Sequence, residues 1–260
     1  MAKLDDAYAN SAYIDGAEAY PGRWAAAAEA YRAALADRAT LGVSYGPSER
    51  QAFDVFLPED APDGVCMFVH GGYWLKFDRS YWSHLAAGAN ARGWAVVMPS
   101  YDLAPQVPIA EITQQIACAV LAMAERFEGP ITLTGHSAGG HLVARMLAPG
   151  LLPENVVARI KRVVPISPVA DLRPLLKTSM NEDFGLDPAG AEAESPVLQP
   201  APSVPVSVWV GGQERPAFLD QARWLAQAWG AEHVEVPGKH HFDVIDALAY
   251  PASDLVARLT

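Results

Sequence analysis

The stretch Ile131-Thr-Leu-Thr-Gly-His-Ser-Ala-Gly-Gly140 decides the fold of this chain. A strand-like run, residues 131–134, passes through a G-x-S-x-G turn, residues 135–139, into a helix-like segment at 138–147. A serine on such a turn lies in strained backbone, and the flanking glycines let neighbouring segments approach closely. Because the turn places the Ser137 hydroxyl at a helix N-terminus, where a developing oxyanion is favoured, we predict that Ser137 is a nucleophile.

Outward from this turn, strand-like and helix-like stretches alternate along the chain. Such alternation indicates βαβ units and a mostly parallel central sheet flanked by helices, which is an α/β fold. The early strands are joined by short turns and are expected to form an antiparallel edge. The predicted strands are residues 52–57, 65–69, 95–98, 131–134, 163–166, 206–210 and 233–236, and the predicted helices are 81–91, 109–127, 138–147 and 217–229.

Two segments lie outside this alternation. The alanine-rich residues 21–38 form an N-terminal helix, so residues 1–40 are expected to be a helical cover. Residues 173–202 are rich in proline, alanine and acidic residues without a sustained period, which makes them the candidate cap or lid. The whole chain, residues 1–260, is expected to be a single domain.

Composition narrows the classes of function. The 260 residues are 51% hydrophobic and carry a formal charge of −11, which opposes binding to nucleic acid or to an anionic membrane. Neither a secretory h-region nor a membrane-length apolar run is present, so a cytoplasmic protein is expected. Cys66 and Cys118 are expected to be two buried free thiols, because their spacing suggests neither a disulfide framework nor a metal site.

A glycine loop upstream of the serine is the predicted oxyanion loop. His70-Gly71-Gly72-Tyr73-Trp74 directly follows the predicted strand 65–69, and its glycines let amide groups turn into a site. We assign the oxyanion donors to the amides of Gly72, Tyr73 and Ala138. His70 is expected to brace the loop. The rings of Tyr73 and Trp74 either line a pocket or pack in the core, and the sequence leaves both readings open.

The acid that follows the serine is predicted at Glu214. Its carboxylate lies on the loop after the predicted strand 206–210, where it could accept a hydrogen bond from an imidazole and fix the tautomer. The rivals Asp220, Asp243 and Asp246 lie in helix-like stretches or beside the histidines, where a solvated carboxylate is the usual finding.

The base is one of two adjacent histidines. Pro237-Gly-Lys-His-His-Phe242 follows the last predicted strand, so His240 and His241 compete for this role on chain position alone. A neutral imidazole with a pKa of about 6.5 is suited to accept the proton of a serine hydroxyl.

Together these motifs resemble a known family. The segments His70 to Trp74 and Gly135 to Gly140 are similar to those of the α/β-hydrolase arylformamidases, also called kynurenine formamidases, and of their esterase relatives. Further similarity lies in Ser100-Tyr-Asp-Leu-Ala-Pro105, Asp171-Leu-Arg-Pro-Leu-Leu176, Gly185-Leu-Asp187 and Ser195-Pro196. The resemblance covers nearly the whole chain and implies the α/β-hydrolase fold.

The resemblance also selects the site residues. The family's base lies in a His-Phe-Asp stretch, which matches His241-Phe-Asp243, and its acid lies two residues before Pro-x-Phe, which matches Glu214. The family usually has aspartate at that position, and both acids serve this role in hydrolases of the fold. Ser137, His241 and Glu214 are therefore the expected catalytic residues.

The function implied by the resemblance is hydrolysis of a small acyl amide or ester through an acyl-enzyme, with N-formylkynurenine as substrate. Tyr73, Trp74 and Trp82 are the expected substrate contacts. A broad carboxylesterase for small acyl esters uses the same residues, and a catalytically silent binding protein on a hydrolase scaffold is the alternative outside enzymes. No metal and no organic cofactor is implied, the expected partner is a small ester or formamide, and a homodimer stays open.

Overall fold

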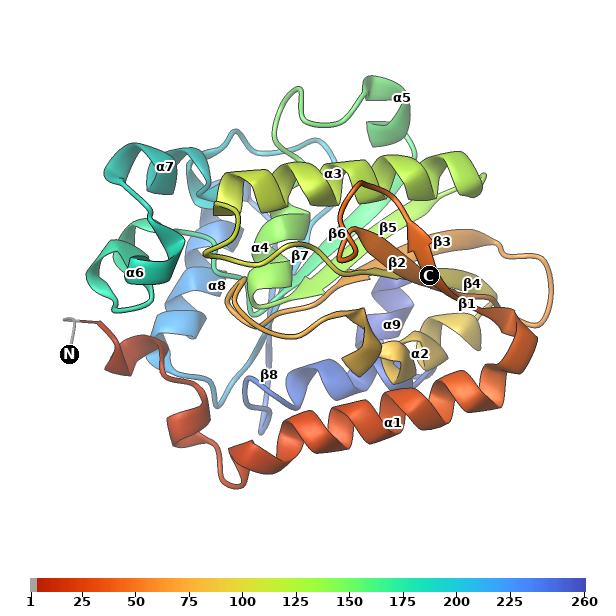
Figure 1. The fold of residues 1–260 in the computed structure, drawn as a ribbon. Coiled ribbons are helices and arrows are strands. Elements are labelled where there is room, and N and C mark those ends of the chain that lie inside the picture. Colours follow the sequence, from red (N-terminus) through yellow and green to blue (C-terminus); the bar gives the residue numbers. More distant parts are fainter. Residues whose placement is uncertain (1–3) are drawn as a thin grey trace.

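The computed structural model describes residues 4–260, and their centre is an eight-stranded sheet with helices on both faces (Figure 1). The strand order is β1-β2-β4-β3-β5-β6-β7-β8. The predicted α/β architecture with a mostly parallel sheet is confirmed. The strands are β1 (Ala39–Ser44), β2 (Ala52–Phe56), β3 (Gly64–Val69), β4 (Trp94–Pro99), β5 (Ile131–His136), β6 (Ile160–Ile166), β7 (Ser207–Gly211) and β8 (Glu232–Val236).

The antiparallel edge involves the early part of the chain, as expected, but of the early predicted strands β3 is not part of it, because it pairs in parallel with β4 and β5. β2 runs antiparallel to both of its neighbours, β1 and β4, whereas the other neighbouring strands pair in parallel. β1 is a strand that the sequence pattern misses. Most of its side chains are exposed and it holds a glycine, so it lacks the apolar run that marks the buried strands.

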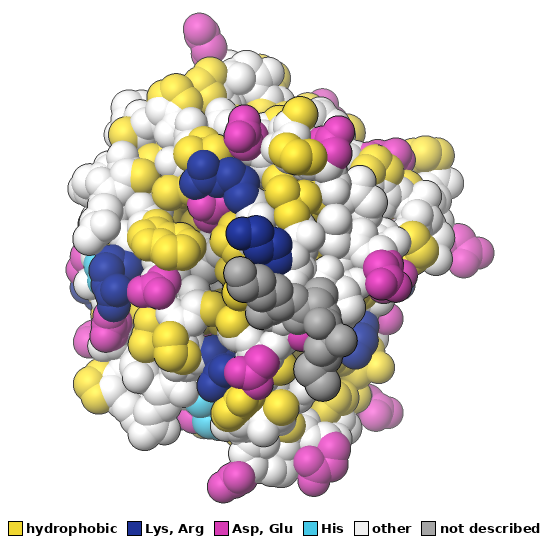
Figure 2. Space-filling view, turned by 90° about the vertical axis from the view of Figure 1, so that its left-hand side faces the viewer, with side chains coloured by type: hydrophobic (Ala, Val, Ile, Leu, Met, Phe, Trp, Pro, Cys, Tyr) yellow, Lys and Arg dark blue, Asp and Glu magenta, His cyan; other side chains and the backbone are white. Residues whose placement is uncertain are grey.

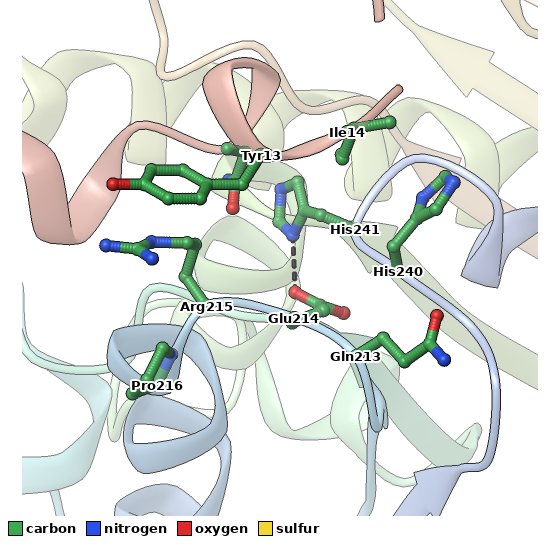
Figure 3. A pocket seen from close by; sticks show the side chains of 9 residues that line it. Tyr13, Ile14, Gln213, Glu214, Arg215, Pro216, His240 and His241 are labelled. Atoms are coloured by element: carbon green, nitrogen blue, oxygen red, sulfur yellow. Dashed lines mark hydrogen bonds and ion pairs between the residues drawn. The ribbon is translucent and has the colours of Figure 1, made fainter. Parts of the chain in front are cut away.

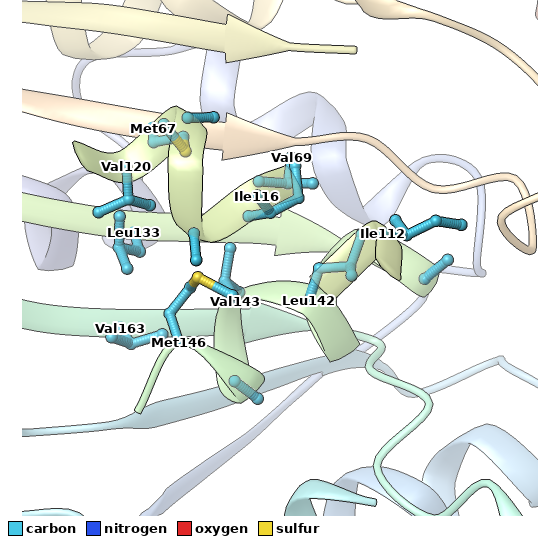
Figure 4. Close-up of a cluster of buried hydrophobic side chains, with 14 of the residues drawn as sticks. Met67, Val69, Ile112, Ile116, Val120, Leu133, Leu142, Val143, Met146 and Val163 are labelled. Carbon is cyan, nitrogen blue, oxygen red and sulfur yellow. The ribbon is translucent and has the colours of Figure 1, made fainter. Parts of the chain in front are cut away.

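Each face of the sheet has its own hydrophobic core because side chains alternate along a strand. In β3, Val65, Met67 and Val69 face one core, while Cys66 and Phe68 face the other. The first core packs against helices α3 (Ile109–Arg126), α4 (Ala138–Arg145) and α8 (Pro216–Trp229), and Figure 4 shows the part of it beneath α3 and α4. The second packs against α1 (Tyr20–Leu35) and α9 (Asp254–Leu259).

Most predicted helices are present. The α-helices are α1 (Tyr20–Leu35), α2 (Ala87–Asn90), α3 (Ile109–Arg126), α4 (Ala138–Arg145), α5 (Glu154–Val157), α6 (Asn181–Phe184), α7 (Pro188–Ala193), α8 (Pro216–Trp229) and α9 (Asp254–Leu259).

The predicted helix 81–91 is wrong as one element. It is divided into two 3-10 turns and the short α2, because Trp82, with φ −121° and ψ −1°, leaves helical geometry. Its ring packs against Trp24, with 4.8 Å between ring centroids.

The two segments outside the sheet have different structures. Residues 173–202 contain 3-10 turns at Arg173–Lys177 and Pro196–Leu198 together with α6 and α7. Before α1, residues 4–19 contain only 3-10 turns, and we call this stretch the N-terminal segment. Figure 2 views the face on which this segment, α6 and α7 lie, where acidic, basic and hydrophobic side chains are interspersed. The division into one domain with a cover and a cap stays a prediction.

The two cysteines differ in exposure. Cys66 is buried, and burial raises the pKa of its thiol to about 12. The prediction for Cys118 is wrong, because this thiol lies on the exposed face of α3. Within residues 4–260, none of the helices is long and apolar enough to cross a membrane.

Candidate active site

Ser137 occupies the turn between β5 and α4. Its backbone has φ 57° and ψ −115°, a conformation that a residue with a side chain rarely adopts. Two hydrogen bonds hold it there: its amide donates to the Ile166 carbonyl at 2.9 Å, and its carbonyl accepts from the His141 amide at 3.0 Å. The strained backbone conformation of Ser137 is therefore held by β6 on one side and by the first turn of α4 on the other.

The glycines beside Ser137 are required by close backbone contacts. A Cβ atom on Gly139 would lie 2.0 Å from the Val69 carbonyl oxygen, and one on Gly135 would lie 2.3 Å from the Gly139 carbonyl oxygen. Real Cβ atoms do not approach this closely, so α4 can start directly against β3 and β5 only with glycine at both positions.

The loop after β3 carries unpaired amides. Gly72 has φ 111° and Tyr73 has φ 54°, and this left-handed backbone turns the chain sharply beside Ser137. The Gly72 carbonyl accepts hydrogen bonds from the amides of Leu75 and Lys76, which closes the turn. Neither the Gly72 amide nor the Tyr73 amide donates to another of residues 4–260. Ala138 is the first residue of α4, where helix amides have no partner within the helix.

His70 braces this loop from behind. Its Nδ1 lies 2.7 Å from the Gly71 carbonyl, and its ring stacks on Tyr101 with 4.4 Å between centroids. The Tyr101 hydroxyl donates to the His70 carbonyl at 2.9 Å. Burial lowers the pKa of His70 to about 4, so the ring stays neutral at pH 7.

Glu214 and His241 form a buried pair. The distance between His241 Nδ1 and Glu214 Oε2 is 2.6 Å, and the two side chains are 4% and 0% exposed. The other carboxylate oxygen, Oε1, accepts from the Ser167 hydroxyl at 2.5 Å and from the Gly211 amide at 2.8 Å. Three donors therefore converge on one carboxylate, which fixes its position and directs one oxygen at the imidazole.

His240 points away from the pair, as Figure 3 shows. Its Nδ1 accepts from the Phe242 amide at 3.1 Å, and its Nε2 lies 3.1 Å from the Tyr20 hydroxyl. Asp243 accepts from the backbone amide of His240 rather than from His241. The second histidine thus closes its own turn and contacts the start of α1.

The remaining rival carboxylates lie elsewhere. Asp220 pairs with Arg223 on the exposed face of α8. Burial and the nearby Asp243 raise the pKa of Asp246, which lies in the 3-10 turn Val244–Ala249. Neither forms a hydrogen bond with His241 within residues 4–260.

A pocket of about 670 Å³ joins the serine, the histidine and the loop. Ser137, His241, Gly72 and Tyr73 all line it. His136 also lines it, with 4.6 Å between the centroids of its ring and the His241 ring, and burial together with His241 holds the pKa of His136 well below its usual range. The apolar wall consists of Tyr8, Trp24, Leu75, Phe77, Trp82 and Phe242.

No hydrogen bond joins the Ser137 hydroxyl to His241 within the described residues. Such catalytic hydrogen bonds are often long without substrate and shorten in the Michaelis complex. The arrangement is an imidazole oriented by a carboxylate and exposed to the same pocket as a strained serine.

The expected aromatic contacts differ from one another. Trp82 lines the pocket, and so does Tyr73, whose hydroxyl donates to the Tyr8 carbonyl at 2.7 Å. The prediction for Trp74 is wrong: its side chain is fully buried and contacts His141 and Phe184 instead of the pocket. Consecutive positive φ angles at Tyr73 and Trp74 turn the two rings to different sides.

The described residues that line the pocket come more from the N-terminal segment and the start of α1 than from residues 173–202. Among the described residues that line the pocket, Met180 alone comes from 173–202. The N-terminal segment and the start of α1 contribute Tyr8, Ala9, Asn10, Ser11, Ala12, Ala17, Glu18, Pro21 and Trp24.

Sequence reasoning missed several residues of this site. Ser167 follows directly on β6, and the rule that functional groups gather at the carboxyl ends of parallel strands could have identified it. Tyr8 and Asn10 carry no local signal, because they reach the pocket only through the packing of the N-terminal segment. Within residues 4–260, no group of three or more His, Cys, Asp or Glu side chains could hold a metal ion.

The sequence of this chain is similar to a known family and to known enzymes. A model of the alpha/beta hydrolase fold family matches residues 66–245. Kynurenine formamidase of Danio rerio is 27% identical over 232 residues, which are 84% of this chain and 79% of that protein. Kynurenine formamidase of Drosophila melanogaster is 29% identical over 227 residues, which are 79% of this chain and 76% of that protein.

Solved structures are also similar. A protein from Silicibacter sp. TM1040, described as a candidate thioesterase, is 63% identical with a TM-score of 0.98 and covers 100% of this chain and 99% of its own. An esterase from Pyrobaculum calidifontis has a TM-score of 0.70 at 18% identity, covers 93% of this chain and 92% of its own, and so shares the fold.

Proposed function

Because this chain belongs to the α/β-hydrolase fold family and is similar to its arylformamidases and esterases, we propose that it is a serine hydrolase. In this proposal Ser137 is the nucleophile, His241 is the general base and Glu214 is the acid that orients the histidine. The observation that carries it is the 2.6 Å contact between His241 Nδ1 and Glu214 Oε2 in a pocket shared with Ser137.

The reaction starts with attack of the Ser137 oxygen on the acyl carbonyl. His241 accepts the hydroxyl proton at Nε2 and then donates it to the leaving amine or alcohol. The acyl group stays on Ser137 until a water molecule, deprotonated by the same nitrogen, attacks the ester and regenerates the serine. Neutral imidazole is required at the start, and Glu214 holds the proton of the ring at Nδ1.

The oxyanion formed by this attack is stabilised by backbone amides. The amides of Gly72 and Tyr73 on the loop after β3 and the amide of Ala138 at the start of α4 are the proposed donors. Each such donor contributes about 3 kcal/mol to stabilisation of the transition state. Their lack of other partners within the described residues supports this role, since no existing hydrogen bond has to break.

For the substrate, we propose an aryl formamide of the N-formylkynurenine type. The similarity to kynurenine formamidases suggests this class, and the aromatic wall formed by Trp24, Phe77 and Trp82 suits an aryl leaving group. The formyl group is the smallest acyl group, so it needs the least room beside Ser137 and the glycine loop.

The test compares two substrates and two proteins. The value of kcat/KM for N-formylkynurenine is expected to exceed that for p-nitrophenyl acetate in the wild type, and Ser137→Ala is expected to lose both activities. A fluorophosphonate probe should label the wild type and leave Ser137→Ala unlabelled. Retention of most activity by Ser137→Ala would refute the serine mechanism.

A second candidate function is cleavage of small acyl esters or thioesters. The 63% identical protein described as a candidate thioesterase favours it, and the same three residues would serve. A kcat/KM that is much higher for p-nitrophenyl acetate or acetyl-thiocholine than for N-formylkynurenine would select this function. Turnover of none of them, with no labelling of Ser137, would select a silent scaffold.

A further inference from the structure

The N-terminal segment is held firmly over the pocket. The Leu4 amide donates to the Lys177 carbonyl at 3.1 Å, and the Arg215 guanidinium donates to the Asp6 carboxylate at 2.8 Å. The Tyr8 side chain is buried, and its hydroxyl accepts from Gln221 at 2.9 Å. These contacts span α8 and the 3-10 turn after β6, so the segment is a built wall of the pocket.

Asn10 is part of this wall. The residue is only 6% exposed, and it lines the pocket that holds Ser137 and His241. It also lines the adjoining pocket of about 230 Å³ behind His241, whose other side chains Figure 3 shows. Asn10 therefore lies on the boundary of both spaces, beside the proposed base.

The side-chain amide of Asn10 has no structural role that the described residues reveal. Asparagine often caps helices, and Asn10 directly precedes the 3-10 turn Ser11–Tyr13, but its side chain makes no capping hydrogen bond. Its Nδ2 is buried without a partner among residues 4–260. A buried donor without an acceptor is unfavourable, so its acceptor is expected to come from outside the chain, as water or as a bound ligand.

We infer that Asn10 is a specificity-determining residue that donates a hydrogen bond to an acceptor oxygen on the leaving group of the substrate. This inference rests on the proposed function, in which Ser137 and the amides of Gly72, Tyr73 and Ala138 hold the acyl group. The acyl carbonyl is then already satisfied, so the acceptor for Asn10 Nδ2 lies on the other side of the scissile bond. The substrate class is an aryl formamide or ester with a carbonyl oxygen next to the scissile group.

The decisive measurement is binding, because it does not depend on turnover. The ligands are aniline and 2-aminoacetophenone, which differ by one acetyl group, and quenching of the pocket tryptophans Trp24 and Trp82 reports their binding. Asn10→Ala is expected to weaken binding of 2-aminoacetophenone about tenfold, as loss of one well-placed hydrogen bond does, and to change binding of aniline less than about twofold.

Kinetics then test the same contact in the transition state. N-formylaniline and its 2-acetyl derivative are compared in wild type and Asn10→Ala, and the ratio of the two kcat/KM values is expected to fall about tenfold in the variant. Asn10→Asp replaces the donor with an acceptor and is expected to lower that ratio at least as far. If the wild type cleaves neither formamide, the proposed substrate is wrong, and phenyl acetate and its 2-acetyl derivative replace them.

A matched control separates recognition from folding. Asp15→Ala removes a side chain of the same size from an exposed position of the N-terminal segment that does not line the pocket. Its affinities for the two ligands and its ratio of the two kcat/KM values should therefore stay as in the wild type. The thermal unfolding midpoints of Asn10→Ala and the wild type should agree. Equal losses for both ligands, or weaker binding that follows a lowered unfolding midpoint, would overturn the inference.

Discussion

Replacement of Glu214 by glutamine tests the proposed acid with almost no change in shape. Oε1 of Glu214 accepts from two donors, the Ser167 hydroxyl and the Gly211 amide, whereas Oε2 faces His241 Nδ1. Glutamine has one acceptor oxygen and one NH₂ group. Its oxygen is expected to take the Oε1 position, because an NH₂ group there would oppose the Gly211 amide, so the NH₂ group faces His241.

This orientation forces the histidine into the wrong tautomer. Nδ1 must accept from the glutamine, the ring proton moves to Nε2, and Nε2 can no longer accept the proton of Ser137. Restoring the active tautomer leaves two buried donors facing each other, which costs about 1–3 kcal/mol. The imidazolium also loses a hydrogen bond to a charged group, worth about 1.5–3 kcal/mol. The sum of about 2.5–6 kcal/mol predicts a fall in kcat between about 10²-fold and 10⁴-fold, with little change in KM.

The assay is steady-state hydrolysis of the best acyl substrate by wild type, Glu214→Gln and a matched control. Glu194→Gln is that control, since Glu194 is an equally buried glutamate outside the pocket that binds Thr113 and Arg145. It should lower the free energy of unfolding but keep kcat within about threefold. A kcat for Glu214→Gln within tenfold of wild type, while Ser137→Ala is inactive, would refute the assignment of Glu214.

Three further predictions address the supports of the site and of the sheet. Ser167→Ala should lower kcat about tenfold with KM within about twofold, because the Glu214 carboxylate loses one of its three donors; an unchanged kcat in the same assay would show that the hydroxyl is dispensable. Gly139→Ala should lower the free energy of unfolding by more than about 4 kcal/mol, or prevent folding, because its Cβ would lie 2.0 Å from a β3 carbonyl oxygen; an unfolding midpoint in urea like that of the wild type would contradict this. Hydrogen bonds from Arg258 and Ser207 lower the pKa of Glu232 to about 2. These bonds therefore stabilise the folded state above the unfolded pKa of about 4.3, and this stabilisation is lost as the pH falls towards 2. Arg258→Gln should therefore reduce the loss of urea stability between pH 5 and pH 3, and an unaltered pH dependence would count against this ion pair.

The sheet was predictable because its buried strands are apolar runs with local signals. The predicted strand 65–69 corresponds to β3, and the helix 109–127 corresponds to α3 within one residue. β1 was not predictable, since an exposed edge strand needs no apolar run. The predicted helix 81–91 breaks at Trp82, whose ring packs against Trp24, and a contact between residues so far apart in the chain leaves no local signal.

The candidate site was predictable only where chemistry follows a strand directly. Ser137 and Glu214 each lie on a turn after a strand, so chain position identified them as candidates. Position could not choose between the two histidines, because that choice depends on which ring contacts Glu214 and which ring accepts a hydrogen bond from the Phe242 amide. A cover was predicted for the N-terminal region, but not which of its residues line the pocket, because nothing in its own sequence says what it packs against.

The glutamate at the acid position has a structural explanation in the loop that carries it. The acid loop and the histidine loop are in contact, since a Cβ on Gly211 would lie 2.5 Å from the Lys239 carbonyl oxygen. Glu214 follows Gly211 by three residues, and its side chain folds back so that Oε1 accepts from the Gly211 amide and from Ser167. With this side chain, one carboxylate binds its own loop and reaches His241 at 2.6 Å. The longer acid and the buried serine beside it therefore act as one unit, which is why changes at either residue should lower kcat with little effect on KM.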